Sequence, residues 1–270
     1  MKKFFIFVFI SFLALPLFAE DTNKGIGLTV GLDYASKSVW RGMYIYEKEG
    51  KFSPFVSYDV LDLGLSVTAE ATIVDDYIFE GKKHNDRFRD NNFVGLSVDY
   101  LNKIGFATLG AGTWYGRYRN HDLSYSETYV SLAFEDIFLS PTITYIHDYY
   151  FKAQEQDALG KDLPKGKDFY VQCGISHSFE LVQYVSLTLG ASAGYYNVAS
   201  WDELSGISDI DFSAKLAVEA GAATYSAGFH YVIVPSKDFY YHYDLYYLER
   251  LREKKDISRF YATFGVAYSF

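Results

Sequence analysis

The sequence RFYATFGVAYSF, residues 259–270, decides the fold class of this chain. Apolar residues alternate in it with small or polar ones, which predicts a β-strand with one apolar and one polar face. Chain ends more often fray and carry polar residues, so a regular strand that runs to a terminal aromatic residue predicts an end paired with another strand. The apolar face carries Phe260, Ala262, Phe264, Val266, Tyr268 and Phe270.

The same alternation recurs along the chain. We identify twelve segments in which one face is apolar and the other carries small or polar residues. Most of them are about as long as a tilted strand that crosses a bilayer, for which roughly 9–11 residues are needed. Helical periodicity is nearly absent. The segments are residues 26–35, 53–60, 63–73, 94–100, 107–115, 128–134, 143–149, 169–179, 185–195, 210–218, 225–233 and 259–270.

The connections between these segments alternate in length. Long polar stretches such as 75–92 and 152–168 follow odd-numbered segments, and short stretches such as 61–64 and 101–105 follow even-numbered ones. Aromatic residues stand near both ends of the apolar faces, which predicts two belts of rings. Short turns at one end, long loops at the other and two aromatic belts are typical of outer-membrane barrels.

These patterns predict an all-β fold, a closed antiparallel transmembrane β-barrel of twelve strands with short periplasmic turns and long extracellular loops. A soluble β-sandwich is the alternative. It is disfavoured because the polar faces are dominated by Ser, Thr, Gly and Asp, whereas a water-exposed sheet usually carries more Lys and Arg. A closed barrel also pairs every backbone polar group, as hydrocarbon requires.

The N-terminus is typical of a secretory signal peptide. Two lysines precede the apolar stretch 4–17, and Ala19 is the small residue expected before a cleavage site. We therefore expect residues 1–19 to be removed and residues 20–270 to form a single outer-membrane barrel domain. A short N-terminal membrane anchor is the alternative, but no stop-transfer pattern follows the apolar stretch.

Charge and cysteine content limit the partners. The chain has 34 acidic and 25 basic residues, a formal net charge of -9, which argues against nucleic-acid binding. The expected partners are outer-membrane lipid, the barrel-assembly machinery and small hydrophilic solutes, and we expect no cofactor or metal.

The single cysteine, Cys173, excludes an intramolecular disulfide. It lies on an apolar face and is interpreted as a small apolar residue, not a nucleophile.

Two stretches resemble known families. The final AYSF, residues 267–270, resembles the C-terminal signal of Gram-negative outer-membrane barrels, and the resemblance gives Tyr268 and Phe270 a role in recognition by the assembly machinery. Residues 32–60 and 63–73 resemble the opening hairpin of porins of the TorF type, whose first strand commonly closes in Ser, an aromatic residue and Arg-Gly. The matching residues here are Ser36, Trp40, Arg41 and Gly42.

A set of charged residues faces the interior in this register, the first three of them along the first strand. Charges are tolerated there because they meet water or one another. Carboxylates outnumber cations, which favours cationic or neutral solutes; the alternative is that salt bridges merely fill a narrow lumen. The pore-lining candidates are Asp33, Lys37, Arg41, Asp59, Glu70, Asp99, Asp148, Asp211, Lys215, Glu219 and His230.

The predicted function is a porin-like channel for passive diffusion of small hydrophilic solutes, with no catalytic residues. One alternative is a structural or adhesive barrel whose loops bind ligands or host molecules. Another is an outer-membrane enzyme, but the phospholipases of this class carry Ser two residues after a lipid-facing His, and none of the six histidines here does. The aromatic loop 239–255 either stacks on sugar or nucleoside rings, folds inward as a constriction, or extends the last hairpin.

Overall fold

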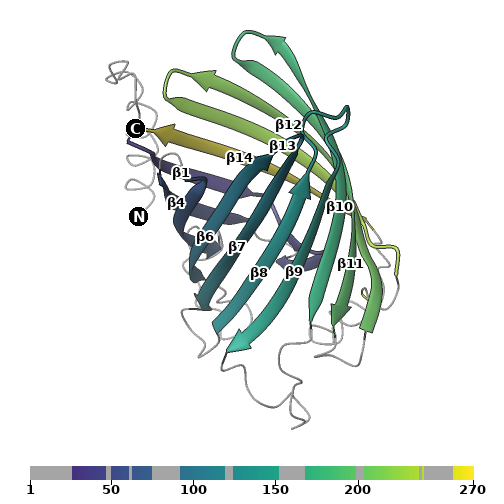
Figure 1. Ribbon diagram of the computed structural model, residues 1–270. Helices are drawn as coiled ribbons and strands as arrows, with labels where there is room; N and C mark the ends of the chain where they lie inside the picture. The colour runs from purple at the N-terminus through teal and green to yellow at the C-terminus, as the bar shows by residue number, and fades with distance from the viewer. Residues whose placement is uncertain are drawn as a thin grey trace.

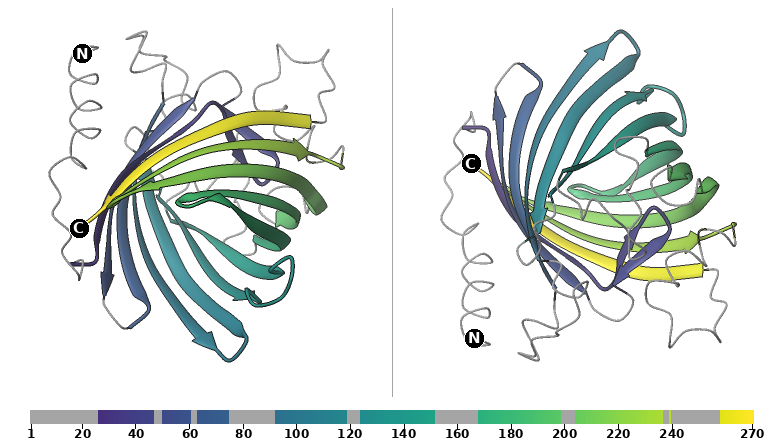
Figure 2. Two further views of the ribbon diagram at one scale, coloured as in Figure 1. Left: turned by 90° about the horizontal axis from the view of Figure 1, so that it is seen from above. Right: turned by 90° about the horizontal axis from the view of Figure 1, so that it is seen from below.

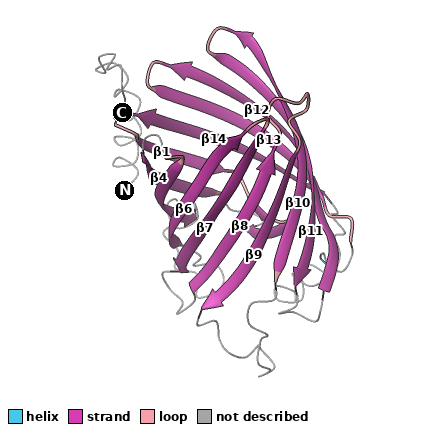
Figure 3. Cartoon of the chain, viewed as in Figure 1, coloured by secondary structure: helices cyan, strands magenta, loops and turns pink. Residues whose placement is uncertain are grey.

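The computed structural model describes residues 26–46, 50–60, 63–74, 92–118, 124–151, 168–198, 204–236, 239 and 258–270. The secondary-structure elements that these residues form are all β-strands (Figure 3). Across them we find no helix with the length and apolar character needed to cross a membrane. The predicted signal peptide, residues 1–19, lies outside the described residues.

Twelve strands form a closed barrel in which each strand pairs antiparallel with its neighbours (Figure 1). This confirms the predicted fold class. The two remaining strands, β2 and β3, form a separate two-stranded sheet. The barrel strands are β1 (Leu28–Ala35), β4 (Lys51–Val60), β5 (Leu65–Val74), β6 (Phe93–Ile104), β7 (Ala107–Tyr118), β8 (Ser124–Ala133), β9 (Thr142–Phe151), β10 (Phe169–Val182), β11 (Val185–Val198), β12 (Leu204–Ala220), β13 (Ala223–Ile233) and β14 (Ser258–Ser269).

The first and last strands close the barrel, as the terminal pattern predicts. β14 pairs with β1 from Thr29 opposite Ser269 to Ala35 opposite Thr263. The backbone N–H of Phe270 continues this seam by donating a 2.8 Å hydrogen bond to the carbonyl of Leu28. The ladder therefore runs around the whole ring, which removes the exposed strand edges that hydrocarbon would not tolerate.

The two ends of the barrel differ in their connections (Figure 1). At one end, which we call the turn end, short links join β4 to β5, β6 to β7, β8 to β9, β10 to β11 and β12 to β13. At the other, the loop end, β1 precedes β4, β5 precedes β6, β7 precedes β8, β9 precedes β10, β11 precedes β12 and β13 precedes β14; in the sequence these pairs are separated by residues 36–50, 75–92, 119–123, 152–168, 199–203 and 234–257. Four of these connections have 15 or more residues, which is the alternation that the sequence predicts. Residues 119–123 and 199–203 are shorter than the eight residues 134–141 between β8 and β9 at the turn end.

The outside of the barrel is apolar. Side chains that alternate along the strands leave large hydrophobic residues exposed, among them Val56, Val94, Leu96, Val130, Leu189, Phe212, Phe229 and Phe264. Exposed rings stand toward both ends. Those toward the turn end are Tyr58, Tyr100, Phe106, Phe138, Phe179 and Tyr184, and those toward the loop end are Tyr115, Tyr149, Tyr195 and Tyr231. A soluble monomer rarely exposes an apolar patch above a few hundred Å².

The first connection at the loop end corrects one prediction. Lys37 and Arg41 do not continue the first strand, because β1 ends at Ala35. Ser36 terminates the ladder: its N–H donates to the carbonyl of Ala262 at 2.8 Å, and its hydroxyl accepts the N–H of Ala262 at 2.9 Å. The side chain thus substitutes for a backbone acceptor, and the chain can leave the wall.

Residues beyond Ser36 form a hairpin inside the ring of strands. It consists of β2 (Ser38–Trp40) and β3 (Met43–Tyr46), and in the end-on views it lies within the outline of the barrel (Figure 2). We call residues 38–46 the inner hairpin. The chain rejoins the wall at Lys51, which pairs directly opposite Ala35.

Candidate functional site in the lumen

The inner hairpin turns at Arg41 and Gly42. Trp40 pairs with Met43, and both intervening residues have positive φ, 49° at Arg41 and 79° at Gly42. Two positive φ values are the pattern of the tight type I′ hairpin turn. Gly42 also packs closely on β12, because a Cβ atom there would lie 2.6 Å from the carbonyl oxygen of Ser208. The turn thus reaches β12, three strands away from β1 around the ring.

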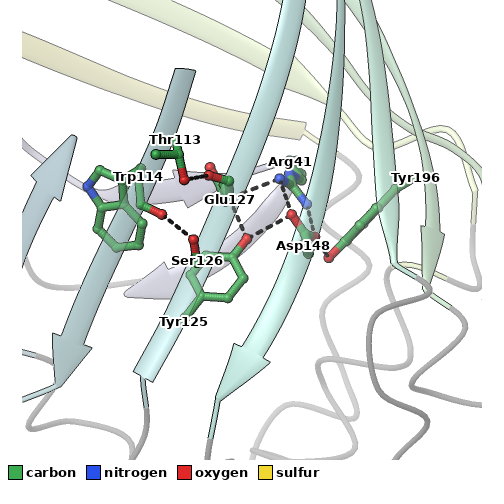
Figure 4. A network of polar contacts seen from close by, with 8 residues as sticks. All are labelled: Arg41, Thr113, Trp114, Tyr125, Ser126, Glu127, Asp148 and Tyr196. Carbon is green, nitrogen blue, oxygen red and sulfur yellow. Dashed lines mark hydrogen bonds and ion pairs between the residues drawn. The ribbon is translucent and has the colours of Figure 1, made fainter. Parts of the chain in front are cut away.

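The guanidinium of Arg41 pairs with two carboxylates of the wall (Figure 4). Nη2 lies 2.9 Å from Glu127 Oε1 on β8 and 2.9 Å from Asp148 Oδ1 on β9, while Nη1 bonds Asp148 Oδ2. The Arg41 side chain is 4% exposed and that of Asp148 is 0% exposed. Two nitrogens on one carboxylate form the bidentate geometry that a guanidinium favours.

Aromatic rings complete the surroundings of Arg41. Its central carbon lies 4.3 Å from the ring centre of Trp40, 4.8 Å from that of Tyr170 and 4.7 Å from that of Tyr196. A cation within about 6 Å of an aromatic face is attracted by the ring electrons. Trp40 belongs to the hairpin, whereas Tyr170 and Tyr196 belong to β10 and β11. We call the four wall residues, Glu127, Asp148, Tyr170 and Tyr196, the guanidinium cage.

Phenol groups hold the carboxylates of the cage. Asp148 accepts hydrogen bonds from Tyr196 at 2.9 Å and from Tyr125 at 3.0 Å, and Tyr125 also bonds Glu127. On the far side, Tyr170 donates to Asp209 at 3.0 Å. A buried charge is costly unless it is paired and hydrogen-bonded, and Asp148 meets both conditions.

An apolar cluster seals the hairpin against the wall. Tyr170, Tyr196, Val198, Val234 and Phe239 are buried together, and Trp40 packs on them. Phe239 is 2% exposed and stacks on Tyr196 with ring centres 6.3 Å apart. This first residue of the aromatic loop 239–255 therefore packs beside the cage. The rest of that loop lies outside the described residues.

Several predicted lining residues share the interior nearer the middle of the barrel. Asp33 on β1 is close enough to interact electrostatically with Lys215 on β12, although β13 and β14 separate their strands in the ring. Such an approach is possible only across the interior. Lys51 and Glu70 join this group, and Glu70 accepts a 2.6 Å hydrogen bond from the indole of Trp114.

The remaining predicted residues are distributed along the wall. Asp99 accepts hydrogen bonds from Tyr129 at 2.7 Å and from Ser97 at 2.8 Å. Asp211 lies 3.0 Å from Nδ1 of His230, whose ring stacks on that of Tyr261.

Three candidates lie outside these groups. Asp59 and Glu219 are exposed near the turn end. Lys37 lies between β1 and β2 and is half-buried. The predicted set is therefore spread over the whole lumen, and only Arg41 and Asp148 take part in the contacts of the cage.

The sequence-based list of candidates missed most of the cage. Glu127 has the inward parity of its segment and could have been found by that rule alone. Tyr170 and Tyr196 also have inward parity. The sequence, however, does not distinguish an aromatic residue inside the barrel from one in the aromatic belts on its outside. In the Trp40–Arg41–Gly42 motif, Arg41 is a predicted lining residue, whereas Trp40 and Gly42 are indicated only by the resemblance to porins of the TorF type.

Known proteins resemble this chain in fold. The NanC porin, in a rhombohedral crystal form, superposes with a TM-score of 0.53 at 14% sequence identity, over 90% of this chain and 100% of that chain. The KdgM porin superposes with a TM-score of 0.51 at 11% identity, over 90% of this chain and 99% of that chain. No protein-family model matches the sequence, and neither does any curated protein.

Proposed function

We propose that this protein is an outer-membrane, porin-like channel through which small hydrophilic solutes diffuse passively, with a preference for cations. The observation that carries the proposal is the contrast between the two faces of the closed barrel. The outside exposes apolar side chains around the ring, whereas the inside carries carboxylates, lysines and hydroxyl groups. A lipid-facing exterior and a polar interior are the requirements for a pore.

The charge of the interior supports a preference for cations. In the groups described above, the carboxylates Asp33, Glu70, Asp99, Glu127, Asp148, Asp209 and Asp211 outnumber the cations Arg41, Lys51 and Lys215. Even at the cage, one guanidinium faces two carboxylates. An excess of fixed negative charge lowers the free energy of a permeating cation relative to an anion.

The fold comparisons support the porin assignment. Two solved structures of similar fold are porins by name, and each is covered almost completely by the superposition. We assign the chain more narrowly to porins of the TorF type on the Ser36–Gly42 motif, which forms the start of the inner hairpin. In this proposal, residues 1–19 direct export, and Tyr268 and Phe270 are read by the barrel-assembly machinery of a Gram-negative cell.

Conductance in planar lipid bilayers tests the proposal. The refolded protein, without residues 1–19, is added to one chamber, and the reversal potential is measured across a gradient of KCl. Stable unitary steps with a reversal potential toward that of K⁺ are expected. A barrel whose boiled and unboiled forms differ in gel mobility, and is thus folded, yet never conducts would contradict the channel and favour a structural or adhesive role.

A further inference from the structure

The groups that hold Arg41 belong to the barrel wall and are positioned without it. Glu127, Asp148, Tyr170 and Tyr196 lie on the four consecutive strands β8 to β11. The hydrogen bonds from Tyr125 and Tyr196 orient the carboxylate of Asp148. Preorganised acceptors and ring faces would therefore stay in place if the hairpin withdrew its side chain.

The chemistry of the cage fits a planar organic cation. Its carboxylates offer a bidentate acceptor and a further oxygen to the guanidinium nitrogens, and its rings lie within 4.8 Å of the central carbon. Carboxylates together with aromatic faces recognise guanidinium and amine groups better than small inorganic cations, because the latter gain less from the rings than they lose in hydration.

The inner hairpin is built so that it can withdraw Arg41 from the guanidinium cage. Its two strands pair with each other in a sheet separate from the barrel. Among the described residues, it contacts the wall through the side chains of Trp40 and Arg41 and through Gly42, and none of these contacts belongs to the barrel ladder. Arg41 also occupies a left-handed φ of 49°, a conformation that is unfavourable for a residue with a side chain. Asn or Gly would fit that position better, which indicates that the arginine head group is what the position requires.

We propose that the guanidinium cage is a solute-binding site for guanidinium- or amine-bearing organic cations at the loop end of the lumen, and that Arg41 is its built-in occupant. This inference rests on the proposed function and names its solute class. A cationic solute that enters from the loop end replaces Arg41 on Asp148 and Glu127, and the hairpin moves aside as the solute binds. In the resting state, Arg41 keeps the two carboxylates paired.

Binding to a vacated cage tests this proposal without relying on conductance. The Arg41→Ala protein, folded in detergent micelles, is titrated with ethylguanidinium by calorimetry and by thermal unfolding. Ethylurea, which has nearly the same shape but no charge, is the matched control. We expect ethylguanidinium to bind with a Kd on the order of 1 mM and to raise the unfolding temperature, with no response to ethylurea. Adding Asp148→Asn to Arg41→Ala is expected to weaken binding at least about tenfold.

A second variant protects the test against misfolding of the first. Replacing residues 36–50 by Asn-Gly joins Ala35 to Lys51, which already lie opposite each other, and vacates the cage without shortening a barrel strand. It also removes the two hydrogen bonds between Ser36 and Ala262. The absence of ethylguanidinium binding in both folded variants, or equal binding of ethylurea, would overturn the inference and leave Arg41 as a structural anchor. A protein that binds ethylguanidinium but never conducts would retain the cage and refute only the channel.

Discussion

The two halves of the lumen have opposite characters. At the loop end, Arg41 is 8% exposed, Asp148 0% and Tyr196 1%, and aromatic rings surround the charges. Toward the turn end, Asp59 and Glu219 are exposed to water, and hydroxyl groups pair across strands, as Ser178 does with Thr188 at 2.7 Å. The same strands form both halves, so the barrel itself does not account for the difference.

The inner hairpin accounts for it. A segment from one connection covers the wall at the loop end and brings a cation, a tryptophan and a close-packed glycine to it. Four of the five turn-end links have at most four residues, and the eight-residue link 134–141 is tied to β10 by the hydrogen bond from Ser176 N–H to the carbonyl of Leu139. In the proposed channel, the restriction to solute passage is therefore expected at the loop end.

The largest effect is expected from removing the hairpin. Replacing residues 36–50 by Asn-Gly closes β1 onto β4 with a two-residue turn, which the pairing of Ala35 with Lys51 permits. Unitary conductance in planar bilayers should rise several-fold, because the loop end then loses its covering segment.

A matched change at the turn end serves as the control for this variant. Gly221 and Ala222 form the two-residue link between β12 and β13, and Ala222→Asn keeps both the length of the turn and the glycine at its positive φ of 62°. The conductance of this control should equal that of the unaltered protein. If the variant without residues 36–50 conducts no better than the control, the hairpin does not restrict the lumen.

The next effect concerns stability. Asp148→Asn removes one partner of a buried ion pair and leaves Arg41 without its bidentate acceptor, so we expect a loss of about 3 kcal/mol in the free energy of unfolding. Asp59→Asn, near the turn end, removes an exposed carboxylate and should change it by less than about 0.5 kcal/mol. Urea-induced unfolding in lipid vesicles measures both. Equal losses in the two variants would show that the two halves do not differ in this respect.

These two regions also show how much of the structure can be predicted from the sequence. The twelve strands, their closure through residues 259–270 and the difference between the ends follow from period-two alternation and connection length, which are local patterns. The inner hairpin does not follow from them. Its position depends on Ser36 ending the ladder and on contacts of Arg41 with Glu127 and Asp148, which are distant in sequence.

Ion selectivity should change by a smaller factor. Arg41→Gln removes the cation that faces Glu127 and Asp148, so the ratio of K⁺ to Cl⁻ permeability should rise about twofold to threefold. The control is Lys103→Gln at the turn end, where the ion pair with Asp136 is more than half exposed and screened by water. Reversal potentials in a KCl gradient measure both variants. A fall in cation preference for Arg41→Gln would contradict the proposed role of the cage carboxylates.

The smallest effect is expected for a hydroxyl pair of the wall. Thr68 donates a 2.8 Å hydrogen bond to Ser57, and water can replace either partner. Ser57→Ala should therefore alter the free energy of unfolding by no more than about 0.5 kcal/mol and leave conductance unchanged. The urea titration used for Asp148→Asn measures this variant as well. A loss in the free energy of unfolding as large as that of Asp148→Asn would show that the wall around Ser57 is packed like the cage.

Cysteine accessibility tests most directly whether the inner hairpin closes the loop end of the lumen. With Cys173 replaced by Ser, a single cysteine is placed at Ser208, which is 0% exposed beneath Gly42, or at the exposed Ser178. Each protein, in lipid vesicles, is treated with a small water-soluble thiol reagent. We predict that the cysteine of Ser178→Cys reacts on the order of tenfold faster than the cysteine of Ser208→Cys. In a protein with Asn-Gly in place of residues 36–50, the two cysteines should react at the same rate. Equal rates with the hairpin present would contradict the account.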